Sequence, residues 1–520
     1  MRRPILSILS LGLFGIASVA MAQPSSTSTT VVKTSGGAVQ GKVASRVDQY
    51  LGIPYAAPPV GELRWQPPRE PKAWGTVFDA RRFGNFCPQE NRGVFAAPSS
   101  TEDCLYLNVY APKGSAGKGK RPVMVWFYGG GLFSGESNDY DGSKLARQGD
   151  VIVVTFNYRI GALGFMSHPA LNGEGHPFAN YGIMDQQFAL KWVQKNIAAF
   201  GGDPGNVTIF GQSGGGTAVM ANLVSPTAAG LFQKAINESG THIAEMPPEA
   251  ALKAGQDIAT AAGCTDQSAA CLRGLSVDQV LKNQRFAVAL IAPDFVVVDG
   301  TIIKQKALDA FSSGNYNRVP ILTGLVRDEQ AFFLPEANTG VAFTADGYAK
   351  DIASFGAANV ERLNAKYPLA SYASPSLADI DMQEGFKACT ARQLDRQWSK
   401  YAPVYAYEFD DRTAPSYFRA LSYPMRAYHT SELQYIFPLF RGGQGTSHAL
   451  NKAQSKLSDA MVGYWTSFAR SGVPKGAVTW ARYAADQDNL MSLDLPSPKP
   501  MKGYGKTYDC TLWDDVLAYK

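Results

Sequence analysis

A glycine-rich turn between a strand-like run and a helix-like run constrains this chain more than any other feature. The run NVTIF (206–210) is apolar and β-branched, and TAVMANL (217–223) is typical of a helix. Between them, Ser213 stands among four glycines in GQSGGG. Such a joint has three interpretations: a phosphate-binding loop, a tight structural turn, or the sharp turn that carries a catalytic nucleophile.

Continuous apolar runs alternate with helical segments along most of the chain. The runs are 123–128, 151–158, 206–210, 234–239, 319–325 and 403–409, and the clearest helical segment is 184–200. Strands that are apolar throughout are buried on both faces, as in a parallel sheet covered by helices. The sequence therefore predicts an α/β fold with a large, mostly parallel sheet. No internal repeat or long linker interrupts it, so we expect one domain over residues 23–520.

The first 22 residues have the layout of a secretory signal peptide. A basic start (Arg2, Arg3) precedes an apolar run (5–19) and a small-residue site at Ala20-Met21-Ala22. A transmembrane anchor is the alternative, but the run is short for a span. We therefore expect cleavage after Ala22 and a secreted or periplasmic protein without a stable membrane anchor.

The charge balance argues against a polyanionic partner. A formal net charge of +5 over 520 residues is too small to indicate binding to nucleic acid. The six cysteines include no C-x-x-C pair, and no histidine cluster accompanies them, so a zinc site is not expected. The sequence gives no oligomeric state.

The glycine-rich turn fits a nucleophile better than a phosphate. A phosphate-binding loop needs a lysine after the glycines, and the next lysine is Lys234. GQSGG is instead G-x-S-x-G between a strand and a helix, the context of a nucleophile elbow. The serine of such a turn is strained, so we expect Gly211 and Gly215 to be small because of crowding. The amide of Gly214 then faces the position where an oxyanion forms.

A serine needs a base, and the chain has only five histidines. His168 and His176 precede Ser213, and His242 follows it too closely to leave room for an acid-bearing strand. Of the remaining two, His429 is favoured over His448, which lies in a glycine-rich stretch.

The acid and the second oxyanion donor are expected after other strands. Asp328 and Glu329 both follow the run 319–325, and spacing alone leaves both open. The acid would hold the imidazole in its working tautomer. Gly129, Gly130 and Gly131 follow the run 123–128, and consecutive glycines let backbone N–H groups converge on a negative charge.

Long segments of the chain resemble the type B carboxylesterases, a family that includes the cholinesterases. The matching blocks are YLGIPYAAPPVGELRWQPP (50–68), TEDCLYLNVY (101–110), GDVIVVTFNYRIGALGF (149–165) and the segment 180–216 that ends in the glycine-rich turn. The resemblance covers nearly all the mature chain. It implies an α/β-hydrolase fold and hydrolysis of a small-molecule ester without a metal or organic cofactor.

The resemblance also implies roles for individual residues. It implies a triad of Ser213, Glu329 and His429, which decides against Asp328. The implied oxyanion hole consists of the amides of Gly130, Gly131 and Gly214, and Ser239 supports the acid. The cysteine spacing indicates two local loops, and the resemblance implies the disulfides Cys87–Cys104 and Cys264–Cys271. Cys389 and Cys510 match no third family bridge, so they either pair or stay free.

Departures from the family pattern bear on the substrate. Gln212 replaces the glutamate common beside the nucleophile, and Gly214 replaces an alanine. The region around residues 87–104 also lacks the tryptophan that cholinesterases use to bind a quaternary ammonium. We therefore expect a neutral carboxylic ester. The alternatives are a lipase acting at lipid surfaces and a non-catalytic cholinesterase-like binding module.

Overall fold

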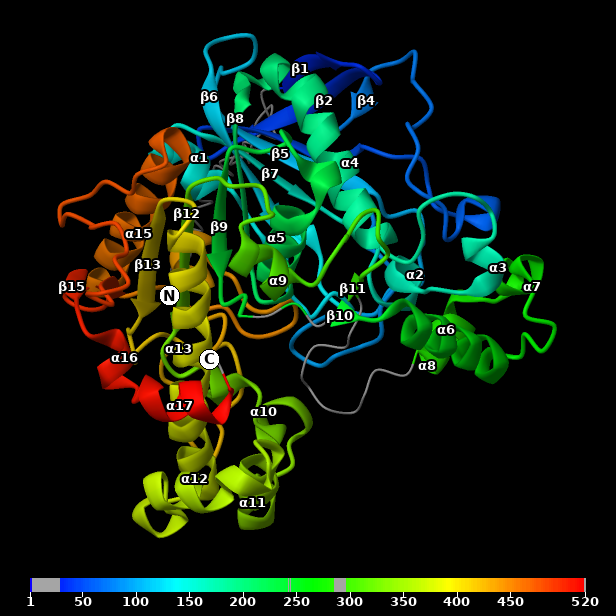
Figure 1. Ribbon diagram of the computed structural model, residues 1–520. Coiled ribbons are helices and arrows are strands. Elements are labelled where there is room, and N and C mark those ends of the chain that lie inside the picture. Colours follow the sequence, from blue (N-terminus) through cyan, green and yellow to red (C-terminus); the bar gives the residue numbers. More distant parts are fainter. Residues whose placement is uncertain (2–28, 242, 244, 285–295, 519–520) are drawn as a thin grey trace.

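The larger of the two sheets among the described residues has 13 strands, in the order β1-β2-β3-β5-β7-β6-β8-β9-β12-β13-β14-β15 with β4 beside β2 (Figure 1). The strands are β1 (Thr29–Thr34), β2 (Gly37–Ala44), β3 (Val47–Pro54), β4 (Phe78–Asp79), β5 (Tyr106–Pro112), β6 (Arg121–Phe127), β7 (Ile152–Phe156), β8 (Gly202–Gln212), β9 (Lys234–Glu238), β12 (Ile321–Val326), β13 (Val404–Phe409), β14 (Leu490–Leu493) and β15 (Lys499–Met501). The strands from β7 to β14 are parallel, whereas β1, β2, β3 and β5 form an antiparallel edge. The predicted large, mostly parallel sheet is confirmed.

The computed structural model describes residues 1, 29–241, 243, 245–284 and 296–518. The predicted signal peptide lies outside them, apart from Met1. Within these ranges, no helix has both the length and the apolar character needed to cross a membrane. A separate two-stranded sheet pairs β10 (Glu245–Met246) with β11 (Val296–Val297).

Helices cover both faces of the sheet. They are α1 (Ser143–Gly149), α2 (Gly161–Phe165), α3 (Pro169–Asn172), α4 (Tyr181–Asn196), α5 (Gly214–Val224), α6 (Pro248–Ala262), α7 (Ala269–Gly274), α8 (Val277–Asn283), α9 (Ala307–Ser313), α10 (Pro335–Thr339), α11 (Ala345–Ser354), α12 (Val360–Lys366), α13 (Pro375–Ser399), α14 (Leu433–Ile436), α15 (Lys452–Ser471), α16 (Tyr504–Thr507) and α17 (Cys510–Val516). α4, α5, α9 and α13 pack together along β8, β9, β12 and β13, and α1 and α15 pack along β5, β6 and β8. A long helix, α13, leads from the sheet to a lower lobe that contains α11 and α12 (Figure 1).

The sequence of α15 shows how one such helix is specified. Asn451 and Gln454 form a capping box at its start, which satisfies backbone N–H groups that have no partner inside the helix. Gly472 ends it with φ 75°, a conformation that glycine adopts without steric cost. The side chains of Met461, Trp465 and others on the same face are buried. Burial of that apolar face fixes the helix against the sheet.

Three disulfides join the six cysteines: Cys87–Cys104, Cys264–Cys271 and Cys389–Cys510. The pairing of Cys389 with Cys510, which the sequence leaves open, ties α13 to α17 across a sequence separation of 121 residues. Loops of that length cost much chain entropy to close, so this bond restrains the unfolded chain most.

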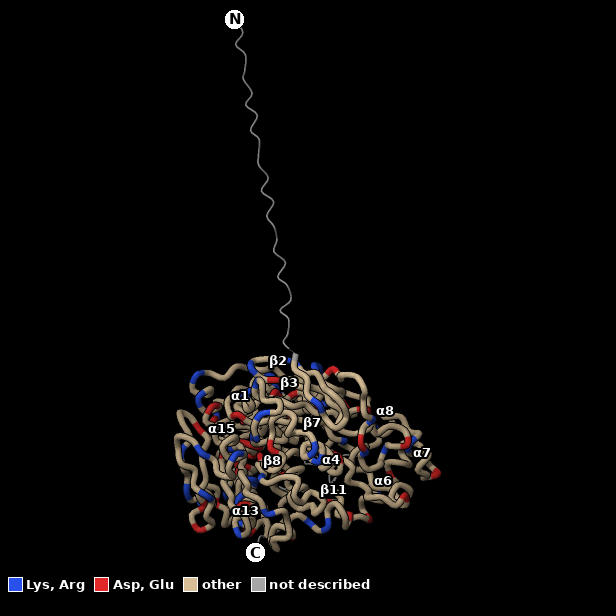
Figure 2. Tube along the Cα trace, turned by 90° about the horizontal axis from the view of Figure 1, so that it is seen from above, with Lys and Arg blue, Asp and Glu red and all other residues tan. Residues whose placement is uncertain are grey.

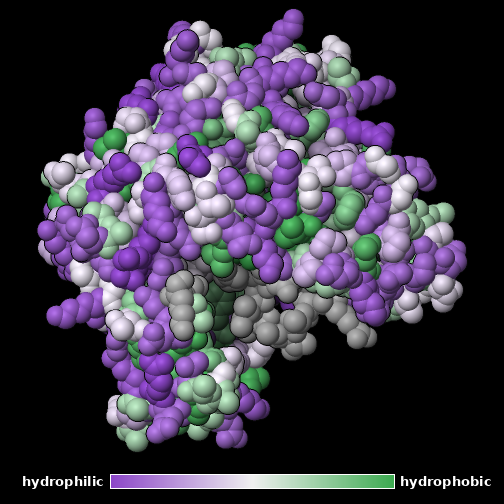
Figure 3. Space-filling model, viewed as in Figure 1, coloured by the Kyte–Doolittle hydropathy of each residue, from purple (hydrophilic) through white to green (hydrophobic). Residues whose placement is uncertain are grey.

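The surface mixes both signs of charge. Figure 2 shows Lys and Arg interspersed with Asp and Glu around the molecule. The face drawn in Figure 3 is mostly hydrophilic, and its hydrophobic residues form small groups.

The parallel strands end at one edge of the sheet, which is where open α/β sheets place their ligand sites. The segments that follow β6, β8 and β12 all begin at that edge. They carry the Gly129–Gly131 run, Ser213 and Glu329, respectively.

Candidate active site

Ser213 lies at the tip of the turn between β8 and α5. Its backbone adopts φ 59° and ψ −124°, a strained conformation for a residue with a side chain. Such strain costs about 1–3 kcal/mol and persists only where the surroundings enforce it. Here the Ser213 N–H donates to the carbonyl of Glu238 on β9 at 2.9 Å. The side chain is half-buried at the end of the sheet.

Two glycines make this turn possible. A Cβ atom on Gly215 would lie 2.0 Å from the carbonyl oxygen of Phe127, and one on Gly211 would lie 2.6 Å from that of Gly215. Neither contact can be relieved by moving a side chain, because both partners are backbone atoms. The prediction that both positions must be small is confirmed.

His429 and Glu329 lie side by side although 100 residues separate them. The imidazole Nδ1 and Glu329 Oε2 form a short hydrogen bond, and both side chains are almost fully buried. A carboxylate can only accept, so Nδ1 carries the proton and Nε2 of the neutral ring is left as a base. This is the orientation that a serine nucleophile requires.

The environment of Glu329 keeps it ionised. Ser239 Oγ donates to Oε1 at 2.5 Å, and the Val326 amide donates to the same oxygen at 3.3 Å. Burial raises the pKa of this carboxyl, but His429, Lys387 and Ser239 together outweigh it, so the pKa lies below its usual value. Ser239 therefore contacts the acid, as the resemblance implies.

Asp328, the other acid that spacing allows, is used differently. Its carboxylate accepts from Arg412 Nε at 2.9 Å and from Arg426 at 3.4 Å. It also accepts from the Ala427 amide, two residues before His429. It therefore anchors the chain that leads to His429 and does not contact the imidazole ring in the described hydrogen bonds.

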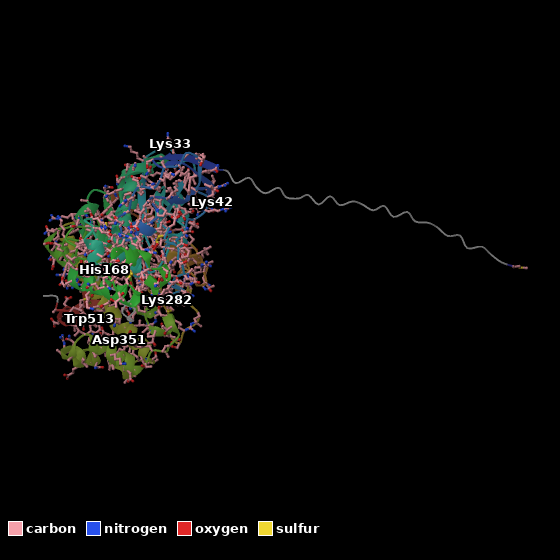
Figure 4. All side chains as sticks on the ribbon, turned by 90° about the vertical axis from the view of Figure 1, so that its right-hand side faces the viewer. Lys33, Lys42, His168, Lys282, Asp351 and Trp513 are labelled. Carbon is pink, nitrogen blue, oxygen red and sulfur yellow. A yellow bond between two sulfur atoms is a disulfide. The ribbon has the colours of Figure 1, made fainter. Side chains whose placement is uncertain are left out.

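Three other histidines lie elsewhere. His448 is exposed, and His176 pairs with Glu174. His168 bonds Gln267 at 2.8 Å and caps the start of α3. Figure 4, which shows the right-hand side of Figure 1, labels His168 above Asp351 of the lower lobe. His242 lies outside the described residues.

Glycines after β6 lie against the turn that bears Ser213. A Cβ atom on Gly214 would lie 2.6 Å from the Gly131 nitrogen, so the two backbones are in close contact. Gly130 and Gly131 have φ 108° and 61°, values that favour glycine. No hydrogen bond from the amides of Gly130, Gly131 or Gly214 occurs among the described parts of the chain. Three N–H donors are therefore available near the serine for a negatively charged oxygen.

Gln212 faces the imidazole ring. Its Nε2 lies 3.3 Å from Nε2 of His429 and 3.4 Å from Nδ1, and only 1% of the residue is exposed. A glutamate here would place a negative charge against the ring. The carboxamide contacts the ring without adding one.

Aromatic side chains that were not predicted from the sequence lie around His429. The rings of Phe332 and Phe333 lie 5.0 Å and 4.8 Å from the imidazole, measured between centroids. Phe95, inside the Cys87–Cys104 loop, packs on Phe332 at 4.8 Å and on Phe418 at 5.6 Å. These rings give the site an apolar wall. The pair Phe332-Phe333, which follows Glu329 closely in the sequence, was the available signal. Its contact with the distant Cys87–Cys104 loop could not be predicted from that pair.

Two further carboxyl groups lie behind the turn and were also missed. Glu238 accepts a hydrogen bond from Trp465 at 2.8 Å, and burial raises its pKa to about 8. Glu432 is fully buried, neither of its oxygens has a partner among the described residues, and burial raises its pKa well above the usual value. Burial therefore disfavours the negative charge of both carboxyl groups. No group of three or more His, Cys, Asp or Glu suited to a metal occurs in the described ranges.

Comparison with known proteins identifies similar chains. A family model described as "Carboxylesterase family" matches residues 28–513. The chain is 34% identical to the medium-chain fatty acyl-CoA hydrolase precursor of Anas platyrhynchos, over 94% of this chain and 93% of that one. It is 34% identical to the para-nitrobenzyl esterase of Bacillus subtilis (strain 168), over 89% and 94%. A solved structure titled PNB esterase superposes with a TM-score of 0.78 at 32% identity, covering 93% of this chain and 99% of that one.

Proposed function

This chain belongs to the carboxylesterase family and is a carboxylic ester hydrolase, and we propose that Ser213, Glu329 and His429 form its catalytic triad. The observation that carries the proposal is the buried His429–Glu329 hydrogen bond at the edge of the sheet where the strained Ser213 stands. A strained serine and a correctly oriented imidazole are costly to maintain, and nucleophilic catalysis uses both.

The proposed reaction has two stages, acylation and deacylation of the serine. Ser213 Oγ attacks the ester carbonyl carbon while His429 Nε2 takes the hydroxyl proton. The carbonyl oxygen becomes negative and accepts hydrogen bonds from the amides of Gly130, Gly131 and Gly214, each worth about 3 kcal/mol in the transition state. The tetrahedral intermediate expels the alcohol, which takes the proton from His429. Water then attacks the acyl-enzyme by the same route, releasing the acid and restoring the serine.

The substrate that this site favours is a neutral ester with an apolar group. The wall of Phe332, Phe333, Phe95 and Phe418 offers burial to an acyl or alkyl chain. Gln212 contacts the histidine without the negative charge that would attract a cationic alcohol.

Matched esters test this preference. Butyrylcholine and its uncharged carbon analogue 3,3-dimethylbutyl butyrate have the same shape and differ in charge. We expect kcat/KM to be at least about tenfold higher for the neutral ester, the effect of about 1.4 kcal/mol. We also expect Gln212→Glu to lower the ratio of kcat/KM for the neutral ester to kcat/KM for the choline ester. A wild-type preference for the choline ester would contradict the assignment, and faster hydrolysis of emulsified than of soluble tributyrin would favour the lipase alternative.

We also propose that the protein is exported. The support is the signal-like N-terminus over residues 1–22 together with three disulfides, since such bonds persist in oxidising compartments. N-terminal sequencing of the protein recovered from the periplasm or the medium is expected to begin at Gln23. A mature protein that retains Met1 would contradict export by cleavage.

A further inference from the structure

One positively charged side chain of α13 lies close to the proposed triad without belonging to it. Lys387 is half-buried where α13 packs against the 3-10 turn Glu329–Phe332. Its Nζ donates to Gln330 Oε1 at 2.9 Å and lies 4.3 Å from the centroid of the Phe333 ring. That same ring packs on His429. The ammonium group is thus separated from the imidazole by one aromatic ring.

Lys387 is held in an unusual way for a lysine inside a protein. Among the described residues it makes no ion pair, and its hydrogen-bond partner, Gln330, is a neutral amide. A half-buried cation without an ion-pair partner loses part of its hydration, and no counterion replaces it. Burial lowers the pKa of Lys387 to about 8, although the carboxylates of Glu329 and Asp379 act in the opposite direction. The lysine is therefore charged at neutral pH, and Glu329 is one of the two carboxylates that favour that charge.

A second carboxyl group, that of Asp379, also acts on Lys387. Asp379, two turns earlier on α13, accepts from Gln330 at 2.8 Å, and burial together with the facing Asp351 raises its pKa to about 7. Burial and Asp351 thus disfavour the negative charge of Asp379, whereas the pKa of Glu329 is lowered.

The remaining charges nearby are paired with one another. Glu384, one turn before Lys387, forms an ion pair with Arg327 at 2.9 Å, and Arg327 also pairs with Asp410. Of the charged groups that act on Lys387, Glu329 is the one that the proposed reaction uses, and His429 lies beyond the Phe333 ring.

We propose that Lys387 is a positioning residue for the triad: its charge, placed beside Glu329 and behind Phe333, keeps Glu329 ionised and opposes protonation of His429. The inference rests on the proposed function, because it assigns a role toward that triad. A cation near a base disfavours the charged, protonated form of the base. His429 then remains available as a base at a lower pH than it would without the lysine. Lys387 thereby extends ester hydrolysis toward acidic pH.

Charge-removing variants test this role through the pH profile. In Lys387→Met we expect the acid limb of the kcat/KM profile to shift to higher pH by about half a pH unit to one pH unit. At a given pH on that limb, kcat/KM should then be about 3- to 10-fold lower than in the wild type. The difference should vanish above about pH 8, where the wild-type lysine itself loses its proton. Lys387→Gln, which keeps the hydrogen-bonding capacity but not the charge, should move the limb by the same amount.

Two controls separate charge from structure. Lys387→Arg keeps the charge and should restore the wild-type profile. Lys400→Met removes one exposed lysine at the end of α13 and should leave the profile unchanged. If Lys387 had only a structural role, its replacement would lower activity by the same factor at every pH. That result would overturn the inference, and so would a pH profile that does not shift in Lys387→Met or in Lys387→Gln.

A second readout does not require catalysis. With ¹⁵N-labelled histidine, the five rings titrate individually by NMR, and His429→Asn identifies the ring of interest. The titration midpoint of the His429 ring should be higher in Lys387→Gln than in the wild type and should be unchanged in Lys387→Arg. If wild-type protein failed to hydrolyse esters, the proposed function would be wrong, yet this titration would still decide the effect of Lys387 on His429.

Discussion

Ser213→Ala should lower kcat by about 10⁴- to 10⁶-fold while leaving the folded structure intact. The oxyanion-hole amides and the binding wall remain, so a small residual rate over water is expected. Alanine also relieves no crowding at this turn, because the strain resides in the backbone at φ 59°. The measurement is the rate of p-nitrophenyl butyrate hydrolysis with purified protein, with the melting temperature recorded alongside.

Ser312→Ala is the matched control, since it removes an exposed hydroxyl on α9. We expect its kcat to equal that of the wild type. Retention of more than about one hundredth of the activity in Ser213→Ala would exclude Ser213 as the nucleophile, given the size of effect that such a group has elsewhere.

Glu329→Gln should lower kcat by about 10³- to 10⁴-fold. A carboxamide at this position offers an N–H₂ group to His429 Nδ1, which favours the tautomer whose Nε2 is already protonated and so cannot accept the serine proton. Ser239 and the Val326 amide still donate hydrogen bonds to the remaining oxygen, so the site keeps its structure. The loss of kcat then results from the changed tautomer of His429. KM should change little, because the acid does not contact the substrate.

The control for this variant is Glu361→Gln, the same substitution at an exposed position of α12. It should leave kcat unchanged. If Glu329→Gln kept most of the wild-type rate, the acid of the triad would have to be sought elsewhere.

The parts of this site that are local in sequence were predictable. The strain at Ser213 and the crowding at Gly211 and Gly215 follow from one strand-turn-helix segment, so G-x-S-x-G was sufficient to anticipate them. The sheet was predictable for a similar reason, because strands buried on both faces are continuously apolar.

Choices that depend on distant residues were not predictable from the pattern alone. Spacing could not decide whether Asp328 or Glu329 is the acid. Asp328 is bound by Arg412 and Arg426, which lie on a loop more than 80 residues later, so the sequence around Asp328 does not reveal these partners. The resemblance to a family selected Glu329. The contact of Phe95 with Phe332 was not predictable for the same reason, because the two residues lie far apart along the chain.

The lower lobe shows this limit most clearly. This part of the chain forms α10–α13; α10 and α13 contact η5 (Glu329–Phe332), and α13 also contacts α17. The disulfide from Cys389 to Cys510 and the approach of Lys387 to Glu329 both arise there. Neither leaves a local pattern, because the partner residues lie far apart along the chain.

The central claim is that Ser213 is a nucleophile activated by its folded surroundings, and covalent labelling tests it most directly. A p-nitrophenyl organophosphonate should label the native protein once per chain, with the modified peptide carrying the phosphonate on Ser213, and should not label urea-unfolded protein or His429→Ala at a comparable rate. Stoichiometric labelling of native protein at any other residue, or equal labelling rates for native and unfolded chains, would contradict the account.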